Sequence, residues 1–344
     1  MLRISAPCVP LLRHVRAITN VAQRTPIAVA FDIDGVLKQG SNVLPEALRA
    51  VKMLQGDNPW HQKVPYLFIT NSGGKLEAAR AKDLSEDFRT TVVPQQVVQA
   101  HTGMRSLAEQ YADKPILMIG GPDMPPGATR NVLESYGFRH VYTAHDLHSY
   151  APASWPYSVS LPEQDAVLKR VDFANIHFAA ILVLHDSREW GRDIQYCVDL
   201  LRSDGGVFGT ALANDQLRAR PAMPIYFSHA DLMWGNEFSV PRLGQGAFRI
   251  ALEAVYARVT EGNEFRAYTY GKPEVSSYEY ANNLLQEMLR GESDHAGANN
   301  FGWSSVLVRT GVYRDVDGPP SSPPTLIVDN VAEAIKSIMK RTWS

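Results

Sequence analysis

Two aspartates separated by one residue are the most chemically suggestive feature of the sequence. Asp32 and Asp34 stand in FDIDGV, at the end of the short apolar run PIAVAFD. Side chains along a strand alternate with a period of two, so both carboxylates would point the same way. Two such carboxylates repel each other unless a proton or a cation lies between them, and an oxygen-only donor set suits Mg²⁺. The alternative is a structural turn, since Asp before Gly is common in turns.

The segments around these aspartates alternate between strand and helix patterns. The apolar run 26–32 predicts a buried parallel strand, helical spacing of apolar residues follows over 44–54, and PYLFIT at 65–70 predicts a second strand. Strand, helix and strand in this order form one crossover unit of a parallel sheet. Because α/β sheets bind ligands at the carboxyl ends of their strands, we expect both aspartates and the end of PYLFIT to meet at one edge.

The middle of the sequence has enough strand patterns for a sheet of its own. Strands are predicted in KPILMIGG, FAAILVLHD and GGVFGT, with helices between them. We expect residues 114–241 to form a separate α/β domain, inserted between two parts of a first domain, 26–113 and 242–344. The second part is predicted to hold helices over 248–255 and 278–288, followed by the strands SSVLV and TLIV.

Composition bounds the class of protein. Of the 344 residues 45% are hydrophobic and 20% charged, which is typical of a globular protein with a sizeable core. The formal net charge of −2 gives no global attraction to nucleic acid or to an anionic membrane. Cys8 and Cys197 are the only cysteines, too few for a disulfide framework or a thiolate metal site. No apolar run reaches the ~20 residues of a transmembrane helix.

The first 25 residues differ in composition from the rest. They contain four arginines, and no Asp or Glu occurs before Asp32. From Pro10 onward, apolar residues follow helical spacing with arginines off the stripe, which is typical of an amphipathic mitochondrial presequence. Residues 1–25 are therefore predicted to be a mitochondrial presequence that directs the protein to the matrix; the alternative is the basic tail of a cytosolic protein.

Three short motifs resemble those of one enzyme superfamily. DIDGV is similar to the first motif of the haloacid dehalogenase (HAD) superfamily, ITNSGG to its second and YGKP to its third. They occur in family order over the whole chain beyond the presequence. The resemblance implies a Rossmann-like parallel-sheet core with an inserted α/β cap. Dehalogenases proper lack the second aspartate, so Asp34 favours a phosphohydrolase.

The resemblance also implies a role for each motif residue. Asp32 would be the nucleophile that takes the phosphoryl group, and Asp34 the acid and base; both would bind Mg²⁺. Thr70 would supply a hydroxyl and Lys272 a positive charge. The phosphate would be bound by the turn formed by Asn71, Ser72 and Gly73. Thr70 and Lys272 also have simpler interpretations, as the end of a strand and as a solvated lysine.

The inserted region is similar to the large cap of the class IIA members, and three longer segments resemble the cat-eye-syndrome critical region protein 5 family, a mitochondrial branch. These segments are AILVLHDSREWGRDIQYCVDLLRSDGG, FSHADLMW and PRLGQGAFRIALEAVY. His185, Asp186 and Trp190 are candidates for substrate contact, or else side chains that pack and cap the domain. The substrate would be a small phosphorylated metabolite or a lipid-derived phosphomonoester, and a homodimer through the cap is possible.

The fourth motif departs from the family pattern. It would be an apolar strand ending in Gly-Asp, followed by a second aspartate that completes the magnesium site. Here LRGESDHAGANNFGWSSVLV has no such strand before Gly291; Asp294 is carried over as a metal ligand, with Glu292 as a weaker substitute. Asp329 could replace the lost ligand, but we interpret it as the N-cap of the last helix.

The missing strand would be central, between the first strand and SSVLV. Its absence would leave a gap beside Asp32. Either SSVLV pairs directly with the first strand and closes the sheet, or the region is poorly ordered and the core strained. A skipped exon, a gene-model error or genuine loss would each produce this pattern. Two functions therefore stay open: a Mg²⁺-dependent HAD phosphohydrolase, and a catalytically silent HAD-like binding or scaffold protein.

Overall fold

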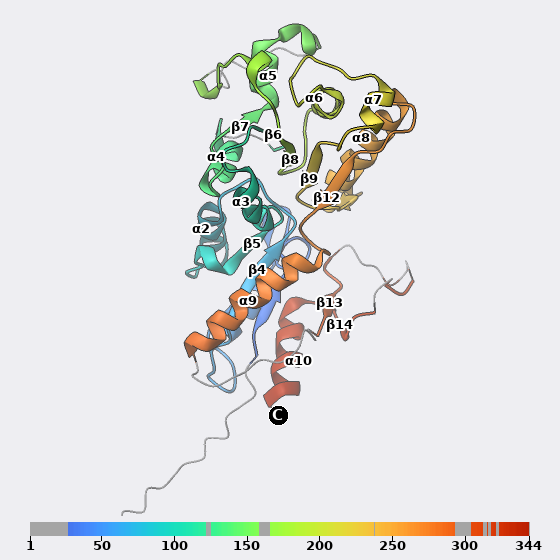
Figure 1. Ribbon diagram of the computed structural model, residues 1–344. Helices are drawn as coiled ribbons and strands as arrows, with labels where there is room; N and C mark the ends of the chain where they lie inside the picture. Colours follow the sequence, from blue (N-terminus) through green and yellow to red (C-terminus); the bar gives the residue numbers. More distant parts are fainter. Residues whose placement is uncertain are drawn as a thin grey trace, which may run out of the picture.

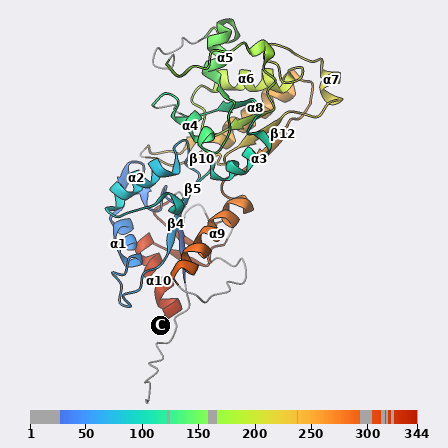
Figure 2. The same cartoon turned by 60° about the vertical axis from the view of Figure 1, so that its left-hand side comes forward.

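The computed structural model describes residues 27–121, 125–157, 166–236, 238–292, 304–311, 315, 318–320 and 323–343. Two parallel sheets organise this part of the chain, and Figures 1 and 2 show them one above the other. We call the lower one, with β1, β4 and β5, the core sheet. The upper one, with β6 to β9 and β12, is the cap sheet. The predicted α/β fold, a parallel-sheet core with an inserted cap, is confirmed.

The core sheet has the order β1 (Val29–Phe31), β4 (Tyr66–Thr70), β5 (Val97–Gln99), with all pairings parallel. Every residue of β4 is buried, as its continuous apolar run predicts for a strand covered on both faces. On one face, β1 and β4 pack against α1 (Pro45–Leu54), α2 (Glu77–Phe88) and α10 (Val331–Trp343). On the other face, β4 and β5 pack against α9 (Val275–Glu292).

The cap sheet is parallel throughout, with the order β12 (Arg266–Thr269), β9 (Pro224–Phe227), β8 (Ala180–Val183), β6 (Ile116–Ile119), β7 (Val141–Thr143). One face packs against α5 (Ala144–Tyr150), α6 (Trp190–Arg202) and α8 (Gln245–Val259), the other against α3 (Ala108–Tyr111) and α4 (Ala128–Ser135). The remaining elements are α7 (Asn214–Arg218) and the hairpins β2 (Lys38–Gln39) with β3 (Asn42–Val43), and β10 (Met233–Trp234) with β11 (Arg242–Leu243).

The cap sheet differs in detail from the sequence prediction. GGVFGT is not a strand: Val207 makes only an isolated bridge to His177. Strands β9 and β12 were not predicted, because PIYF is short and RAYT is mixed in polarity. Since β12 lies within the segment 242–344 expected in the first domain, the cap sheet extends beyond residue 241. The domain limits stay a prediction, and we propose the second boundary after β12.

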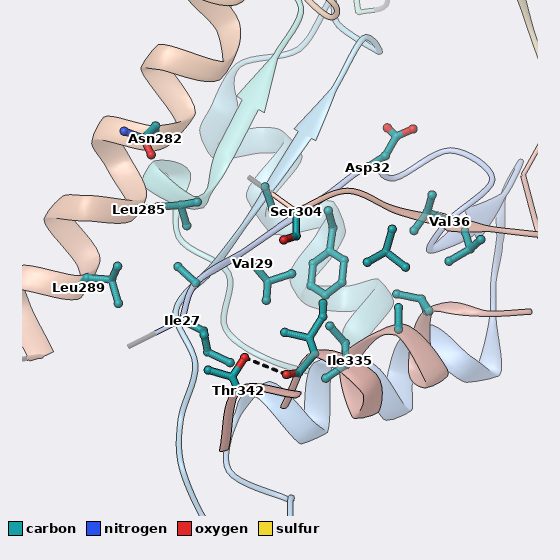
Figure 3. Close-up of a pocket in the computed structure, with 18 of the residues that line it drawn as sticks. Ile27, Val29, Asp32, Val36, Asn282, Leu285, Leu289, Ser304, Ile335 and Thr342 are labelled. Atoms are coloured by element: carbon teal, nitrogen blue, oxygen red, sulfur yellow. Dashed lines mark hydrogen bonds between the residues drawn. The ribbon is translucent and has the colours of Figure 1, made fainter. Parts of the chain in front are cut away.

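The end of the chain forms a separate strand pair. β13 (Val306–Val308) and β14 (Leu326–Val328) pair in parallel with each other, and among the described residues neither pairs with β1. The direct pairing of SSVLV with the first strand, one of our two expectations, is therefore wrong. A cavity of about 460 Å³ lies between β1 and β13, with α9 and α10 at its sides (Figure 3).

The start of α10 corrects one prediction. Asn330, not Asp329, caps this helix, since its side-chain oxygen accepts from the backbone N–H of Glu333 at 3.1 Å. The Asp329 carboxylate instead binds Arg309 at 2.8 Å. Asp329 therefore acts as an ion-pair partner of the residue that follows β13.

Phe248 gives a test of the cap core. It is fully buried on α8, and its ring packs edge-on against that of Trp190, with 5.6 Å between the ring centroids. We expect Phe248→Ala to lower the free energy of unfolding by about 3–5 kcal/mol, because the substitution leaves a cavity. Ile250→Ala on the same helix is the control, since Ile250 is 58% exposed and should change stability by less than about 0.5 kcal/mol. Denaturant unfolding measures both; equal effects would contradict this packing.

Candidate active site

Four predicted catalytic residues meet at the carboxyl ends of β1 and β4. Asp32 and Asp34 follow β1, and Thr70 ends β4. The Lys272 ammonium lies 2.7 Å from Asp32 Oδ1, although 240 residues separate them in sequence. The Thr70 hydroxyl donates to Asp34 Oδ2 at 3.4 Å. The juxtaposition is the one expected from parallel strands, while the catalytic roles stay predictions.

Hydration and charge act differently on the two aspartates. Partial loss of hydration, and then repulsion from Asp32, raise the pKa of Asp34 above its usual value. The charges of Arg80 and Lys272 and the Thr70 hydroxyl oppose this shift. Both side chains can be reached from solvent: Asp34 is exposed, and Asp32, held by the ammonium of Lys272, has a side chain 41% exposed. The two carboxyl groups therefore differ in their partners: Asp32 is ion-paired with Lys272, whereas Asp34 has a raised pKa and accepts a hydrogen bond from Thr70.

Asn71 contacts the backbone of Lys272 in both directions. Its Oδ1 accepts from the Lys272 N–H at 2.8 Å, and its Nδ2 donates to the Lys272 carbonyl at 2.9 Å. The same Nδ2 donates to Asp231 Oδ2, in the loop after β9, at 2.9 Å. The side chain therefore ties the turn after β4 to the turn that carries the lysine and to the cap. Its predicted role in binding phosphate stays a prediction.

The next residue of this turn is already hydrogen-bonded on both its backbone and its side chain. The Ser72 N–H donates to Thr70 Oγ1 at 3.0 Å, and Ser72 Oγ accepts from Arg80 Nη2 at 2.9 Å. Arg80, on α2, thus brings a positive charge to the site. The sequence did not predict it, because a lone arginine inside a helix carries no motif.

Two glycines allow the cap to approach this turn. A Cβ on Gly73 would lie 2.8 Å from His101 Cδ2, and one on Gly74 would lie 2.7 Å from His185 Cδ2. Gly74 also has a φ of +80°, which side-chain-bearing residues rarely adopt. The predicted phosphate turn is therefore also the contact surface between the core sheet and the cap.

The substrate-contact candidates divide into two kinds. His185 and Asp186 lie in the loop after β8, against the turn of the core sheet, and burial lowers the pKa of His185 to about 3. Trp190 instead packs inside the cap: its indole N–H donates to the Ser187 carbonyl at 2.9 Å and its ring contacts Phe248. The geometry agrees with packing for Trp190 and leaves His185 and Asp186 beside the site.

His229, which follows β9, lies between two carboxylates. Its Nε2 is 3.6 Å from Asp186 Oδ1, and its Nδ1 is 3.7 Å from Asp231 Oδ2. Burial lowers the pKa of His229 and raises that of Asp186. Sequence reasoning did not single out His229 or Asp231, although both stand in FSHADLMW; their proximity to Lys272 depends on the cap sheet.

The donor set is compatible with part of a magnesium site. Mg²⁺ binds in proteins through one or two carboxylates together with water and substrate phosphate, and Asp32 and Asp34 supply two carboxylates. Within the described ranges no cluster of three His, Cys, Asp or Glu residues is arranged to hold a metal ion. The third predicted ligand, Asp294, and the side chain of Glu292 lie outside the described residues, as does the predicted presequence.

Comparison with known proteins gives the same family throughout the chain. A haloacid dehalogenase-like hydrolase model matches residues 29–139, and a second HAD-hydrolase-like model matches 269–334. A mitochondrial hydrolase of Saccharomyces cerevisiae is 34% identical over 92% of this chain and 96% of its own length. A Schizosaccharomyces pombe fusion of cardiolipin synthase (CMP-forming) with a mitochondrial hydrolase is 36% identical; the match covers 92% of this chain and 54% of the fusion.

Solved structures agree on the fold. A possible sugar phosphatase of the HAD superfamily from Cytophaga hutchinsonii has a TM-score of 0.58 at 16% identity, covering 89% of this chain and 94% of its own. A 4-nitrophenylphosphatase from Thermotoga maritima has a TM-score of 0.53 at 16% identity, covering 90% and 97%. At these identities the likeness concerns the fold alone.

Asn71 gives the prediction that follows from this geometry. In Asn71→Ala the Lys272 N–H loses its acceptor, so we expect the free energy of unfolding to fall by about 2 kcal/mol. Asn71→Asp keeps an acceptor but places a second negative charge beside Asp231, so it should not restore stability. Asn175→Ala, at an exposed asparagine of the cap, is the control. Denaturant unfolding of an Asn71→Ala variant as stable as the unmodified protein would show that the amide does not restrain this turn.

Proposed function

The chain belongs to the haloacid dehalogenase-like hydrolases, and from this premise we propose that it is a Mg²⁺-dependent phosphomonoesterase that reacts through an aspartyl-phosphate at Asp32. The observation that carries the proposal is the 2.7 Å contact between the Lys272 ammonium and Asp32, with Asp34 two residues further on. A nucleophile, a proton carrier and a fixed positive charge are the groups that phosphoryl transfer requires.

The proposed reaction has two steps. An Asp32 carboxylate oxygen attacks phosphorus, the bond between phosphorus and the ester oxygen breaks, and Asp34 gives its proton to the leaving oxygen. Asp34 then takes a proton from water, whose oxygen attacks phosphorus and breaks the bond to Asp32, releasing inorganic phosphate. The raised pKa of Asp34 favours the protonated form needed first. Lys272 offsets negative charge near the phosphoryl group.

Asp32 would hold the Mg²⁺ ion through its carboxylate and Asp34 through its backbone carbonyl, which leaves the Asp34 carboxyl to carry the proton. Asp294 is the proposed further acidic ligand, with Glu292 as its weaker substitute. When bound, the ion supplies positive charge for the phosphate oxygens. The chain's own contribution is to orient Asp32 through Lys272 and Asp34 through the Thr70 hydroxyl.

We propose a mitochondrial location, in the matrix, because two relatives are named mitochondrial hydrolases and the first 25 residues have the composition of a presequence. Within the described residues no helix has the length and apolar character needed to cross a membrane. A hydrolase joined to cardiolipin synthase in fission yeast favours a lipid-derived phosphomonoester over other small phosphorylated metabolites as the substrate.

A homodimer through the cap also belongs to this proposal. The segment 232–243, which includes the β10–β11 hairpin, exposes several large apolar side chains, a surface that a protein partner could cover. These side chains are Leu232, Met233, Trp234, Phe238, Val240 and Leu243.

One observation favours the second candidate, a catalytically silent binding protein. The strand that carries Asp32 has a described neighbour on one edge only, and a cavity lies along the other. A nucleophile on a weakly supported strand is poorly fixed, and loss of positioning alone lowers a rate strongly. Activity measurements therefore distinguish the two functions.

Hydrolysis of 4-nitrophenyl phosphate tests the enzyme proposal. We expect turnover with Mg²⁺ that EDTA removes. Asp32→Asn should abolish it, because the amide is not a nucleophile, and Asp34→Asn should lower kcat by about 10²–10⁴-fold. Asp83→Asn, at an aspartate of α2 that pairs with Lys75, is the control and should keep full activity. Turnover that survives in Asp32→Asn would exclude the assigned nucleophile, and no turnover in the unmodified protein would favour the silent protein.

The metal ligands are tested separately. Asp294→Asn should raise the Mg²⁺ concentration for half-maximal activity at least about tenfold, since even outer partners of a metal site contribute 10–100-fold to affinity. Glu292→Gln should have the smaller effect. Titration of activity with Mg²⁺ measures both variants. An unchanged Mg²⁺ requirement in Asp294→Asn would show that this carboxylate is not a ligand.

A further inference from the structure

Two strand edges face the same cavity. The N–H of Val29 donates to the Pro65 carbonyl on the side of β4, so the next residue, Ala30, directs its backbone N–H and C=O toward the other edge. On β13, Ser305 and Arg309 make backbone bonds to the β14 side, which leaves those of Val306 directed away from it. Among the described residues no strand pairs with either of these edges. Residues of both strands line the cavity.

Helices close the other two sides with largely apolar side chains. Leu285 and Leu289 of α9 face the cavity from one side, and Ile335 of α10 from the other (Figure 3). Ile338 of α10 also lines it. Ile27 and Asp32 mark its two ends. The space therefore has a strand edge on each of two sides and a helix face on each of the other two, like the position of an inner strand in a parallel sheet.

The segments that follow the carboxyl ends of the two strands are in contact. At the carboxyl end of β1, the Gly35 carbonyl accepts from the Thr310 hydroxyl at 2.8 Å, and a Cβ on Gly35 would lie 2.9 Å from Gly311 Cα. Thr310 and Gly311 follow the carboxyl end of β13. Since both strands end at this contact, one strand placed between them could pair in parallel with each.

Backbone polarity decides which occupant suits the cavity. A fatty acyl chain would cover the apolar side chains but would leave the outward backbone groups of β1 and β13 buried without partners, which is unfavourable. An extended peptide satisfies both edges and both helix faces at once. We propose that this cavity is a docking site for one β-strand of a partner polypeptide, about six residues long, apolar on both faces and parallel to β1.

The chain's own connection between α9 and β13 has an unsuitable sequence. Residues 293–303 read SDHAGANNFGW, in which no two apolar side chains are adjacent. A strand buried on both faces needs a nearly continuous apolar run. The proposed occupant therefore comes from another polypeptide. Its docking depends on the cavity and the two strand edges, so it is independent of whether the site is an active phosphatase.

A peptide that copies residues 179–184, AAILVL, with lysines added at both ends for solubility, is a suitable probe. These residues come from the β8 segment, which pairs on both edges and is apolar on both faces. We expect the fluorescein-labelled peptide to bind the full chain with saturable anisotropy and to raise its melting temperature. Hydrogen exchange at the amides of Ala30 and Val306 should slow when it binds.

Two matched controls separate strand pairing from apolar contact. A peptide with N-methyl groups on alternate residues keeps every side chain but loses backbone donors, and should bind at least about tenfold more weakly. On the protein, Val306→Pro removes the outward N–H at an edge position where proline is tolerated, and should weaken binding, while Val306→Ala should not.

Three outcomes would overturn the proposal: no binding of the AAILVL peptide, equal binding of its N-methylated form, or displacement of the peptide by oleate with no protection of the two amides. The last result would assign the cavity to an acyl chain. Circular dichroism shows whether Val306→Pro folds, and the peptide pair tests the proposal if it does not. None of these measurements requires turnover, so their failure is distinct from failure of the proposed activity.

Discussion

The structure depends on how the negative charges beside β1 are compensated. Asp32 and Asp34 are fixed close together by the strand period, and partial loss of hydration together with repulsion from Asp32 raises the pKa of Asp34. The positive charges of Lys272, 240 residues from Asp32, and of Arg80 on α2 compensate these carboxylates. Compensation from such distant segments requires that the turn after β12 return from the cap to the end of β1. The position of the cap therefore determines the electrostatics of the site.

The turn after β4 holds the lysine-bearing turn and the cap in these positions. Asn71 holds the Lys272 backbone and reaches Asp231 of the cap, while Gly73 and Gly74 leave room for His101 and His185. A larger residue at Gly74 would push the cap away from the site, and one at Gly73 would displace His101. The same few atoms therefore orient the lysine and set the distance between the two sheets, so that access to Asp32 and cap position are linked.

The sequence predicted the parts of the site that depend on local pattern. The strand patterns ending in DID and TNSGG predicted that Asp32, Asp34 and Thr70 would meet, and the resemblance to the HAD motifs added Lys272. Arg80 and His229 were missed because their proximity comes from helix and sheet packing, which leaves no motif.

Sequence patterns did not identify strands that are short or mixed in polarity. RAYT is half-buried at the edge of the cap sheet, so neither alternation nor an apolar run identified β12. GGVFGT has apolar residues and turn glycines but joins no sheet, since only Val207 makes a bridge. For α10, both Asp329 and Asn330 could cap the helix, and the nearby Arg309 attracts the charged one.

The absent strand connects fold and chemistry. In an inner position each strand is held by two neighbours, whereas β1 has one within the described part of the chain, and its outward backbone groups face a cavity of about 460 Å³. Apolar side chains of α9 and α10 pack against the remaining core strands, and this packing does not require the absent strand. Positioning of Asp32 is more demanding than folding, since a displacement of about 1 Å at a nucleophile lowers a rate about 10²-fold while changing stability little. A chain with this gap can therefore keep the fold and the charge arrangement of a hydrolase and still depend on a strand from elsewhere for full activity.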